Sequence, residues 1–305
     1  MKQKLLLGIL LFSILSLSSQ TITVERSYRL FDGDRTGFYP VFNADGSLLA
    51  FTGDGYAGLD VFNFADGSVI HVTQEQGAGF DPVFTDDGRI FFRNVVRKDR
   101  LRFEGVQSFD LQTRTVREVI EPQRNLRRLQ SFGNSVTVAV DDNRLLRASF
   151  QENSEPVSAV PYVWSDGQNL NIQRNGQSQR LNPVEGANGY IWATLSPNRQ
   201  MISFIAVGKG AFISDLDGNI ISSLGHFSAP VWFGDEFIVG MIDEDDGHVI
   251  TGSRIVMKSI DGSVSQTLSP PNQIAMFPAA SSAASKVAYN TADGIIYILE
   301  LNIIR

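Results

Sequence analysis

The chain has 305 residues, of which 43% are hydrophobic and 19% charged, and its net charge at pH 7 is −7. This composition is typical of a folded globular protein with one or two domains. The acidic balance argues against a nucleic-acid partner, because phosphate binding needs a basic surface. The chain has no cysteine, which excludes disulfides and thiolate metal sites.

Residues 1–19 form the pattern of a secretory signal peptide. A basic start, MKQK, precedes an apolar run at 5–17 that is too short to span a bilayer comfortably, and small polar residues follow. We expect cleavage near Ser18 or Ser19 and a mature domain over 20–305; an uncleaved buried or amphipathic segment is the alternative. The expected location is the periplasm or the cell exterior. We expect no lipid anchor and no transmembrane span.

The mature chain repeats one unit. YPVFNADGSLLAF at 39–51 and DPVFTDDGRIFF at 81–92 share a proline, an aromatic residue and an Asp-Gly turn. The same shape returns in YIWATLSPNRQMISF at 190–204, APVWFGDEFIVG at 229–240 and MFPAASSAASKVAYNT at 276–291. We name the shared position the proline slot, and it holds Pro40, Pro82, Ala193, Pro230 and Pro278.

Each unit continues with further short strands separated by tight turns. Asp-Gly pairs such as Asp66-Gly67, Asp217-Gly218 and Asp261-Gly262 suit such turns, because glycine adopts positive φ and aspartate tolerates it. Four short strands in a repeat of about 40 residues are typical of a β-propeller blade. The sequence therefore predicts an all-β propeller.

The number of blades depends on the segment between Pro82 and Ala193. Its strand-like pieces suffice for one full blade with an extended middle or for two thin blades, so six blades are favoured and seven are the alternative. Within this segment, the basic stretch RNLRRLQ at 124–130 is interpreted as a solvated strand face, with a functional patch as the alternative.

Ring closure follows from the two ends of the repeat array. The last unit ends after its third strand, GIIYILEL at 294–301, and the mature chain begins with a lone strand, TITVERSYRL at 21–30. Pairing of these N- and C-terminal strands is predicted to complete the last blade and to remove an open sheet edge.

The units resemble the TolB-like propeller repeat. The resemblance rests on the Pro-x-Phe-x-x-Asp-Gly turn, the aromatic end of the second strand and the Asp-Gly before the last strand, and it covers 38–123 and 185–305. The chain from 190 onward also looks similar to uncharacterised secreted TolB-like proteins of Bacteroidetes. TolB itself carries an N-terminal α/β domain that binds its Tol partners. We expect this chain to lack that domain, so the resemblance does not transfer TolB's role.

Enzyme motifs are sparse. The sequence has no Gly-x-Ser-x-Gly elbow and no phosphate-binding loop in a strand–loop–helix setting. Its histidines, His71, His226 and His248, fall in different units, but propeller loops can converge at one mouth and hold a metal there. A metal-dependent lyase or lactonase that uses histidines and carboxylates at the channel mouth is therefore the alternative function.

An acidic run, DEDDGH at 243–248, is the one local cluster of charge. Neighbouring carboxylates repel one another, so the run is either solvated, in contact with a basic partner, or bound to Ca²⁺. The metal candidates are Asp243, Asp245 and Asp246, and the partner-contact candidates are Asp243, Glu244, Asp245, Asp246 and His248. We do not expect a tight Ca²⁺ site, because only Asp243 and Asp245 have the spacing that turns both carboxylates inward.

The sequence thus predicts a monomeric binding or scaffold module that recognises a protein, a peptide or an envelope glycan at one face of the propeller. No catalytic residue is assigned, and no cofactor is expected.

Overall fold

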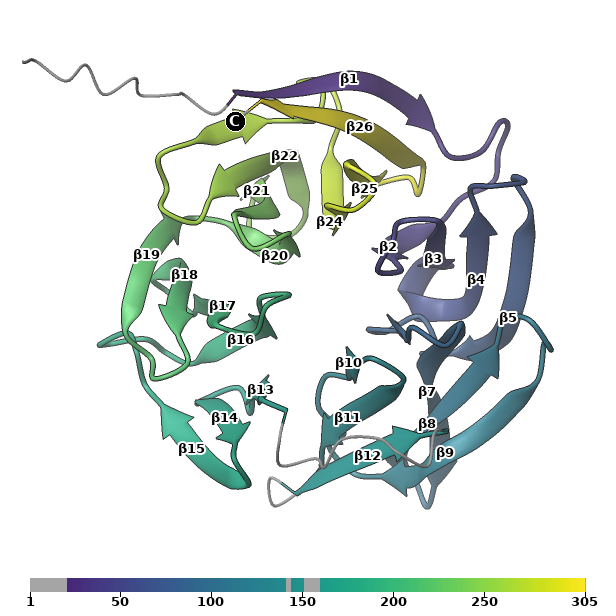
Figure 1. Cartoon of the computed structure of the whole chain (residues 1–305). Coiled ribbons are helices and arrows are strands. Elements are labelled where there is room, and N and C mark those ends of the chain that lie inside the picture. The colour runs from purple at the N-terminus through teal and green to yellow at the C-terminus, as the bar shows by residue number, and fades with distance from the viewer. Residues whose placement is uncertain (1–20, 141–143, 151–159, 305) are drawn as a thin grey trace, which may run out of the picture.

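The computed structural model describes residues 21–140, 144–150 and 160–304, so the predicted signal peptide lies outside the described residues. The described residues form seven antiparallel sheets arranged as blades around a central axis (Figure 1). The protein is a seven-bladed β-propeller, which confirms the predicted fold class. No helix in these ranges is long and apolar enough to cross a membrane.

Four blades are built from four consecutive strands each. Blade 1 contains β2 (Phe38–Phe42), β3 (Leu48–Thr52), β4 (Ala57–Asn63) and β5 (Val69–Gln76). Blade 2 contains β6 (Val83–Phe84), β7 (Arg89–Lys98), β8 (Leu101–Asp110) and β9 (Val116–Gln123). Blade 5 contains β16 (Tyr190–Leu195), β17 (Met201–Ala206), β18 (Gly210–Asp215) and β19 (Ile220–Gly225). Blade 6 contains β20 (Ser228–Phe233), β21 (Phe237–Asp245), β22 (Ile250–Ser259) and β23 (Ser265–Thr267).

Blades 3 and 4 have only three strands each within the described residues. Blade 3 contains β10 (Gln130–Phe132), β11 (Ser135–Ala139) and β12 (Leu145–Ser149), and blade 4 contains β13 (Tyr162–Ser165), β14 (Leu170–Arg174) and β15 (Gln177–Leu181). The segment between Pro82 and Ala193 therefore folds as two thin blades. The protein therefore has seven blades, which is the alternative count and not the favoured six. Three short strands suffice here for a blade.

Blade 7 closes the ring by joining the two ends of the described chain. It contains β24 (Ala275–Ser281), β25 (Lys286–Thr291), β26 (Ile296–Ile304) and β1 (Thr21–Arg29), with β1 on the outside. β1 pairs antiparallel with β26 from Thr21 opposite Ile304 to Arg29 opposite Tyr297. Figure 1 shows the purple β1 lying along the yellow β26. This pairing confirms the predicted closure.

The hydrophobic core lies between adjacent blades. Seven clusters of buried apolar side chains fill the seven interfaces, and the largest joins blades 6 and 7 through residues such as Met257 and Tyr289. The smallest joins blades 3 and 4 and contains three buried residues, Ala139, Tyr162 and Trp164. Burial of apolar area between sheets thus holds the ring, as expected for a chain without disulfides.

The repeated acidic turns are closed by their own side chains. Oδ1 of Asp45 accepts hydrogen bonds at 2.9 Å from the backbone N–H and at 2.6 Å from the hydroxyl of Ser47. Gly46 between them has φ of +71°, and a Cβ there would lie 2.4 Å from the Cβ of Ala284. The Asp-Gly pair therefore supplies both a turn acceptor and the room that the neighbouring blade needs.

Candidate functional site

The proline slot of the repeat lies on the wall of the central channel. The residue before the slot has a φ between +48° and +53° in all five units: Tyr39, Asp81, Trp192, Ala229 and Phe277. In four innermost strands, the pairing register with the next strand skips at this point, which marks a β-bulge. Proline suits the slot because it has no N–H to contribute to a ladder.

The five residue pairs formed by each slot and the residue before it face one space, and in four of them a bulge contributes to this direction. A bulge bends its strand and re-aims the side chain at that position. All five pairs line a cavity of about 410 Å³, which we name the channel mouth. The other end of the innermost strands borders a second cavity of about 600 Å³, which is lined by residues such as Phe42, Phe132 and Ser281. The positive φ recurs in five units, so it is a regular feature of the repeat and not backbone strain at a single functional residue.

Aromatic side chains cover one side of the channel mouth. The ring of Tyr39 stacks on Tyr56 with centroids 4.2 Å apart and meets Phe277 at 4.5 Å. Tyr56 in turn meets Phe80 edge-on at 5.2 Å. Burial and a hydrogen bond with Tyr39 raise the pKa of the Tyr56 phenol. These contacts form a continuous aromatic row from blade 7 across blade 1 to the start of blade 2.

Two neighbouring side chains on β16 expose apolar surface toward the same cavity. Ile191 is 40% exposed and Trp192 is 38% exposed, and both line the channel mouth, as does Phe80 at 39%. Single exposed apolar residues are common on protein surfaces, whereas a group around one cavity is typical of a binding site. The channel mouth therefore offers apolar surface for a ligand.

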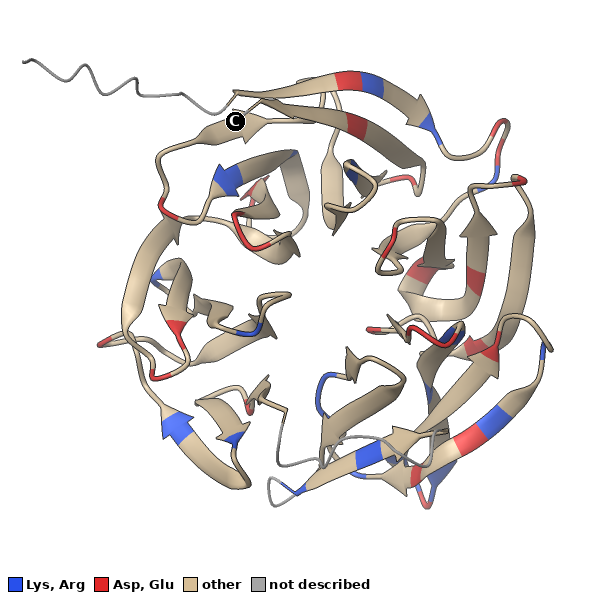
Figure 2. Cartoon of the chain, viewed as in Figure 1, with Lys and Arg blue, Asp and Glu red and all other residues tan. Residues whose placement is uncertain are grey.

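A basic segment borders the channel mouth from blade 3. Arg127 and Arg128 lie just before β10 and line the cavity, and Figure 2 shows this segment in blue beside the channel. The guanidinium of Arg128 lies 3.5 Å from the carboxylate of Asp81. The stretch 124–130 was interpreted as a solvated strand face, and that interpretation is wrong for these two residues, because the chain turns inward here before the strand begins.

Two buried side chains hold this basic segment by its carbonyl groups. Arg93 of β7 is 1% exposed and donates to the carbonyls of Leu126 at 3.0 Å and of Arg127 at 2.6 Å. The hydroxyl of Tyr162 donates to the carbonyl of Arg128 at 2.7 Å. Backbone groups that are bound in this way leave the arginine side chains of the segment free to face the channel.

The acidic run at 243–248 lies at the tip of the β21–β22 hairpin. Its carboxylates close the turn: Oδ1 of Asp245 accepts the N–H of Gly247 at 2.8 Å, and Oδ1 of Asp246 accepts those of His248 and Val249 at 2.9 Å. Glu244 lies 3.7 Å from Arg254. Local donors therefore offset part of the repulsion. The assignment of Asp243, Glu244, Asp245, Asp246 and His248 to a partner or a metal stays a prediction.

The histidines lie in different parts of the ring. His71 is on β5, where its Nδ1 is 2.8 Å from Asp60, while His226 lies in the β19–β20 connection and His248 in the β21–β22 turn. No group of three metal-ligating side chains that could hold an ion occurs in the described ranges. None of the three histidines lines the channel mouth.

Sequence reasoning missed the residues of the channel mouth. The proline slot is recognisable in the sequence as a marker of the repeat, but the direction of the side chain before it is not. The available signal was the large aromatic residue before the slot in three units, Tyr39, Trp192 and Phe277.

Structural comparisons agree with the fold, whereas no protein-family model and no curated protein matches the chain. A crystal structure of TolB from Acinetobacter baumannii matches 82% of this chain with a TM-score of 0.53 and 15% identity. The chain covers 58% of that TolB chain. A chain in a crystal structure of the mitotic checkpoint complex matches 98% of this chain, is itself covered to 99%, and has a TM-score of 0.58 and 10% identity. The fold is thus a propeller similar to that of TolB, while the likeness to Bacteroidetes proteins stays a prediction.

Proposed function

We propose that the protein is a secreted binding module that takes an extended peptide segment of a partner protein into the channel mouth. The observation that carries this proposal is the convergence of five slot segments, each with a positive φ, on one cavity with exposed apolar side chains and two arginines. A cavity of about 410 Å³ lies within the range of roughly 300–1,000 Å³ that ligand pockets occupy. The secretory location rests on the signal-peptide pattern at 1–19.

A peptide suits this cavity better than a glycan. Sugar rings stack on free, flat aromatic faces, but Tyr39 stacks on Tyr56 and packs against the tilted ring of Phe277. The remaining exposed surface comes from Ile191, Trp192 and Phe80, which form an irregular apolar wall suited to branched or aromatic side chains. Arg127 can pair with a carboxylate of the same peptide through charge-assisted hydrogen bonds.

The experiment is a selection on the folded protein. A displayed library of random 12-residue peptides is panned against the immobilised mature chain, and a panel of neutral and acidic oligosaccharides is tested on the same surface. We expect enriched peptides with apolar or aromatic residues, and no oligosaccharide binding. Binding of an oligosaccharide together with no enriched peptide would overturn the proposal in favour of a glycan ligand.

A further inference from the structure

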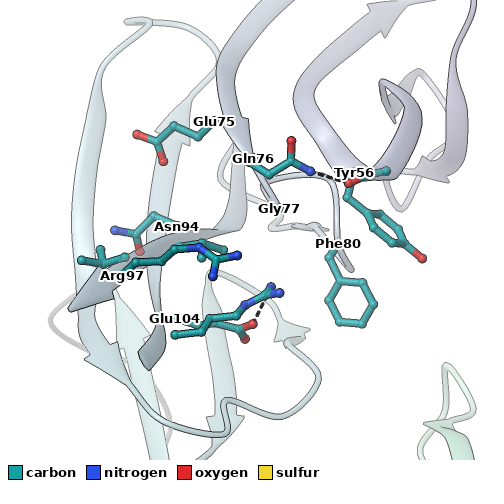
Figure 3. Close-up of a pocket in the computed structure, with 12 residues that line it drawn as sticks. Tyr56, Glu75, Gln76, Gly77, Phe80, Asn94, Arg97 and Glu104 are labelled. Atoms are coloured by element: carbon teal, nitrogen blue, oxygen red, sulfur yellow. Dashed lines mark hydrogen bonds and ion pairs between the residues drawn. The ribbon is translucent and has the colours of Figure 1, made fainter. Parts of the chain in front are cut away.

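A third cavity adjoins the channel mouth on its blade 1 and blade 2 side. It encloses about 920 Å³ between the end of β5 and the β7–β8 hairpin, and we name it the interblade cleft. Tyr56 and Phe80 line both the cleft and the channel mouth. Figure 3 shows Phe80 and Tyr56 on one side of the cleft and Glu75, Asn94, Arg97 and Glu104 on the other. A ligand chain that leaves the channel mouth over these two rings therefore enters the cleft.

The cleft contains a buried polar atom without a partner. Asn94 of β7 is 7% exposed and lines the cleft, and its Oδ1 has no hydrogen-bond partner within the described residues. Buried polar groups are almost always hydrogen-bonded, so an amide without partners beside a cavity indicates a position that a ligand can complete. Oδ1 is covered by Gly105, whereas Nδ2 of the same amide is the group that can donate to a bound chain.

The opposite strand is shaped to hold this amide. Gly105 of β8 pairs directly with Asn94 in the ladder. A Cβ at position 105 would lie 2.4 Å from Oδ1 of Asn94 and 2.8 Å from the carbonyl oxygen of Ile120. Only glycine leaves the room that the amide occupies, even though glycine weakens the interior of a strand. Asn94 supplies the amide with the unpaired Oδ1, and Gly105 leaves the space for it, so both residues are needed for this arrangement.

The cleft and its rim carry an excess of positive charge. Arg97 on the cleft wall and Lys98 and Arg100 at the hairpin tip are exposed, and Arg97 has no ion pair within the described residues. Arg102 and Arg93 share one carboxylate, that of Glu104, at 2.8 and 2.5 Å. The acidic side chains Glu75 and Asp99 offset only part of this charge. In a protein of net charge −7, such a local excess favours an acidic ligand.

We propose that the interblade cleft is a second subsite that binds an acidic end of the peptide held in the channel mouth. Nδ2 of Asn94 donates to a carbonyl oxygen of the peptide, and Arg97 pairs with one of its carboxylates. The apolar part of the peptide lies in the channel mouth, and the chain crosses Tyr56 and Phe80 between the two. This inference rests on the proposed function and adds the chemistry and the direction of the ligand.

The test uses the peptides from the library selection and their affinities for variants of the full mature chain. We expect Asp and Glu to be enriched at one end of the selected peptides. Arg97→Glu should weaken the binding of such a peptide about tenfold, because attraction becomes repulsion. The matched control is Arg180→Glu, which makes the same charge change at an exposed position on β15 of blade 4, and it should leave the affinity unchanged.

Asn94→Leu supplies a readout that a misfolded variant would not give. It should weaken peptide binding about tenfold through the lost donor while leaving the melting temperature equal or higher, because it also removes the unsatisfied buried Oδ1.

The failures of the two proposals are distinguishable. The cleft subsite alone would be overturned by selected peptides that lose binding in Trp192→Ala, carry no acidic end, and bind Arg97→Glu as tightly as Arg180→Glu. A selection without any peptide sensitive to Trp192→Ala would overturn both proposals.

Discussion

Arg93 and Glu104 form an ion pair between the channel mouth and the interblade cleft, with Nη1 of Arg93 2.5 Å from Oε2 of Glu104. Only 2% of the Arg93 side chain is exposed, and its guanidinium also lies over the ring of Phe80 at 5.1 Å. One buried cation therefore contacts the cleft carboxylate, the ring shared by both cavities and the carbonyls of the basic segment. Its position makes it the structural link between the two cavities.

Loss of the Glu104 charge should destabilise the protein. Glu104→Gln leaves the buried guanidinium of Arg93 without a counter-charge, and we expect the free energy of unfolding to fall by at least about 2 kcal/mol. Urea denaturation measures the change, and Glu121→Gln, at an exposed position on β9, serves as the control. Equal stability of both variants would show that the pair contributes nothing.

Removal of β1 should open the ring. Deletion of 21–30 exposes the edge of β26 and removes the buried side chains of Ile22 and Leu30. We expect aggregation or a loss of several kcal/mol, since an unpaired edge strand templates association. Thermal melts and size-exclusion chromatography measure both effects, with Glu25→Ala on the exposed face of β1 as the control. A deletion variant that melts like the parent would contradict ring closure.

Acid should weaken the turns that aspartates close. The hydroxyl of Ser259 and the donors of Ser263 lower the pKa of Asp261 to about 2, against about 3.9 in an unfolded chain. The unfolded state then binds more protons than the folded state between about pH 4 and pH 2, so stability falls as the pH drops through this window. Asp261→Asn keeps an acceptor but does not titrate.

Melting temperatures at pH 5 and pH 2.5 test this prediction. The drop between the two should be smaller in Asp261→Asn than in the parent, while Asp34→Asn, at an exposed aspartate outside these turns, should drop like the parent. An unchanged drop in Asp261→Asn would remove Asp261 as a source of acid sensitivity.

Calcium should not stabilise the protein through the acidic hairpin tip. Asp245 and Asp246 already accept backbone hydrogen bonds from their own turn, and Ca²⁺ needs six or more oxygen ligands. Melts in chelator and in excess Ca²⁺ should therefore coincide. An upward shift of several degrees that disappears in Asp243→Asn/Asp245→Asn would instead identify a metal site.

Much of the fold could be predicted from the sequence because its determinants are local. Asp45 and Gly46 specify a turn through one side-chain acceptor and one positive φ, and the same chemistry recurs along the chain. Closure by β1 and β26 followed from counting strands. The blade count was less accessible, because the strands of blades 3 and 4 are short and lack the proline slot, and whether three strands form a blade depends on packing against neighbours such as Trp164.

The site was harder to predict because it depends on the ring. Tyr39, Trp192 and Phe277 are distant in sequence, and only the closure of the propeller brings them to one cavity. Asn94 and Gly105 are unremarkable in the sequence, and their relation depends on the register of β7 and β8. Arg127 and Arg128 were visible as a basic stretch, but their orientation is set by Arg93 and Tyr162 from adjacent blades.

Peptide binding at the channel mouth is tested by the affinity of a selected peptide for Trp192→Ala. Isothermal titration calorimetry compares this variant with the parent and with Ile220→Ala, at a similarly exposed apolar position, 41% against 38%, on the outer strand β19. We predict at least about a tenfold loss for Trp192→Ala, as expected for a binding hot spot, and none for Ile220→Ala. Equal affinities of the parent and both variants would show that the peptide binds elsewhere on the propeller.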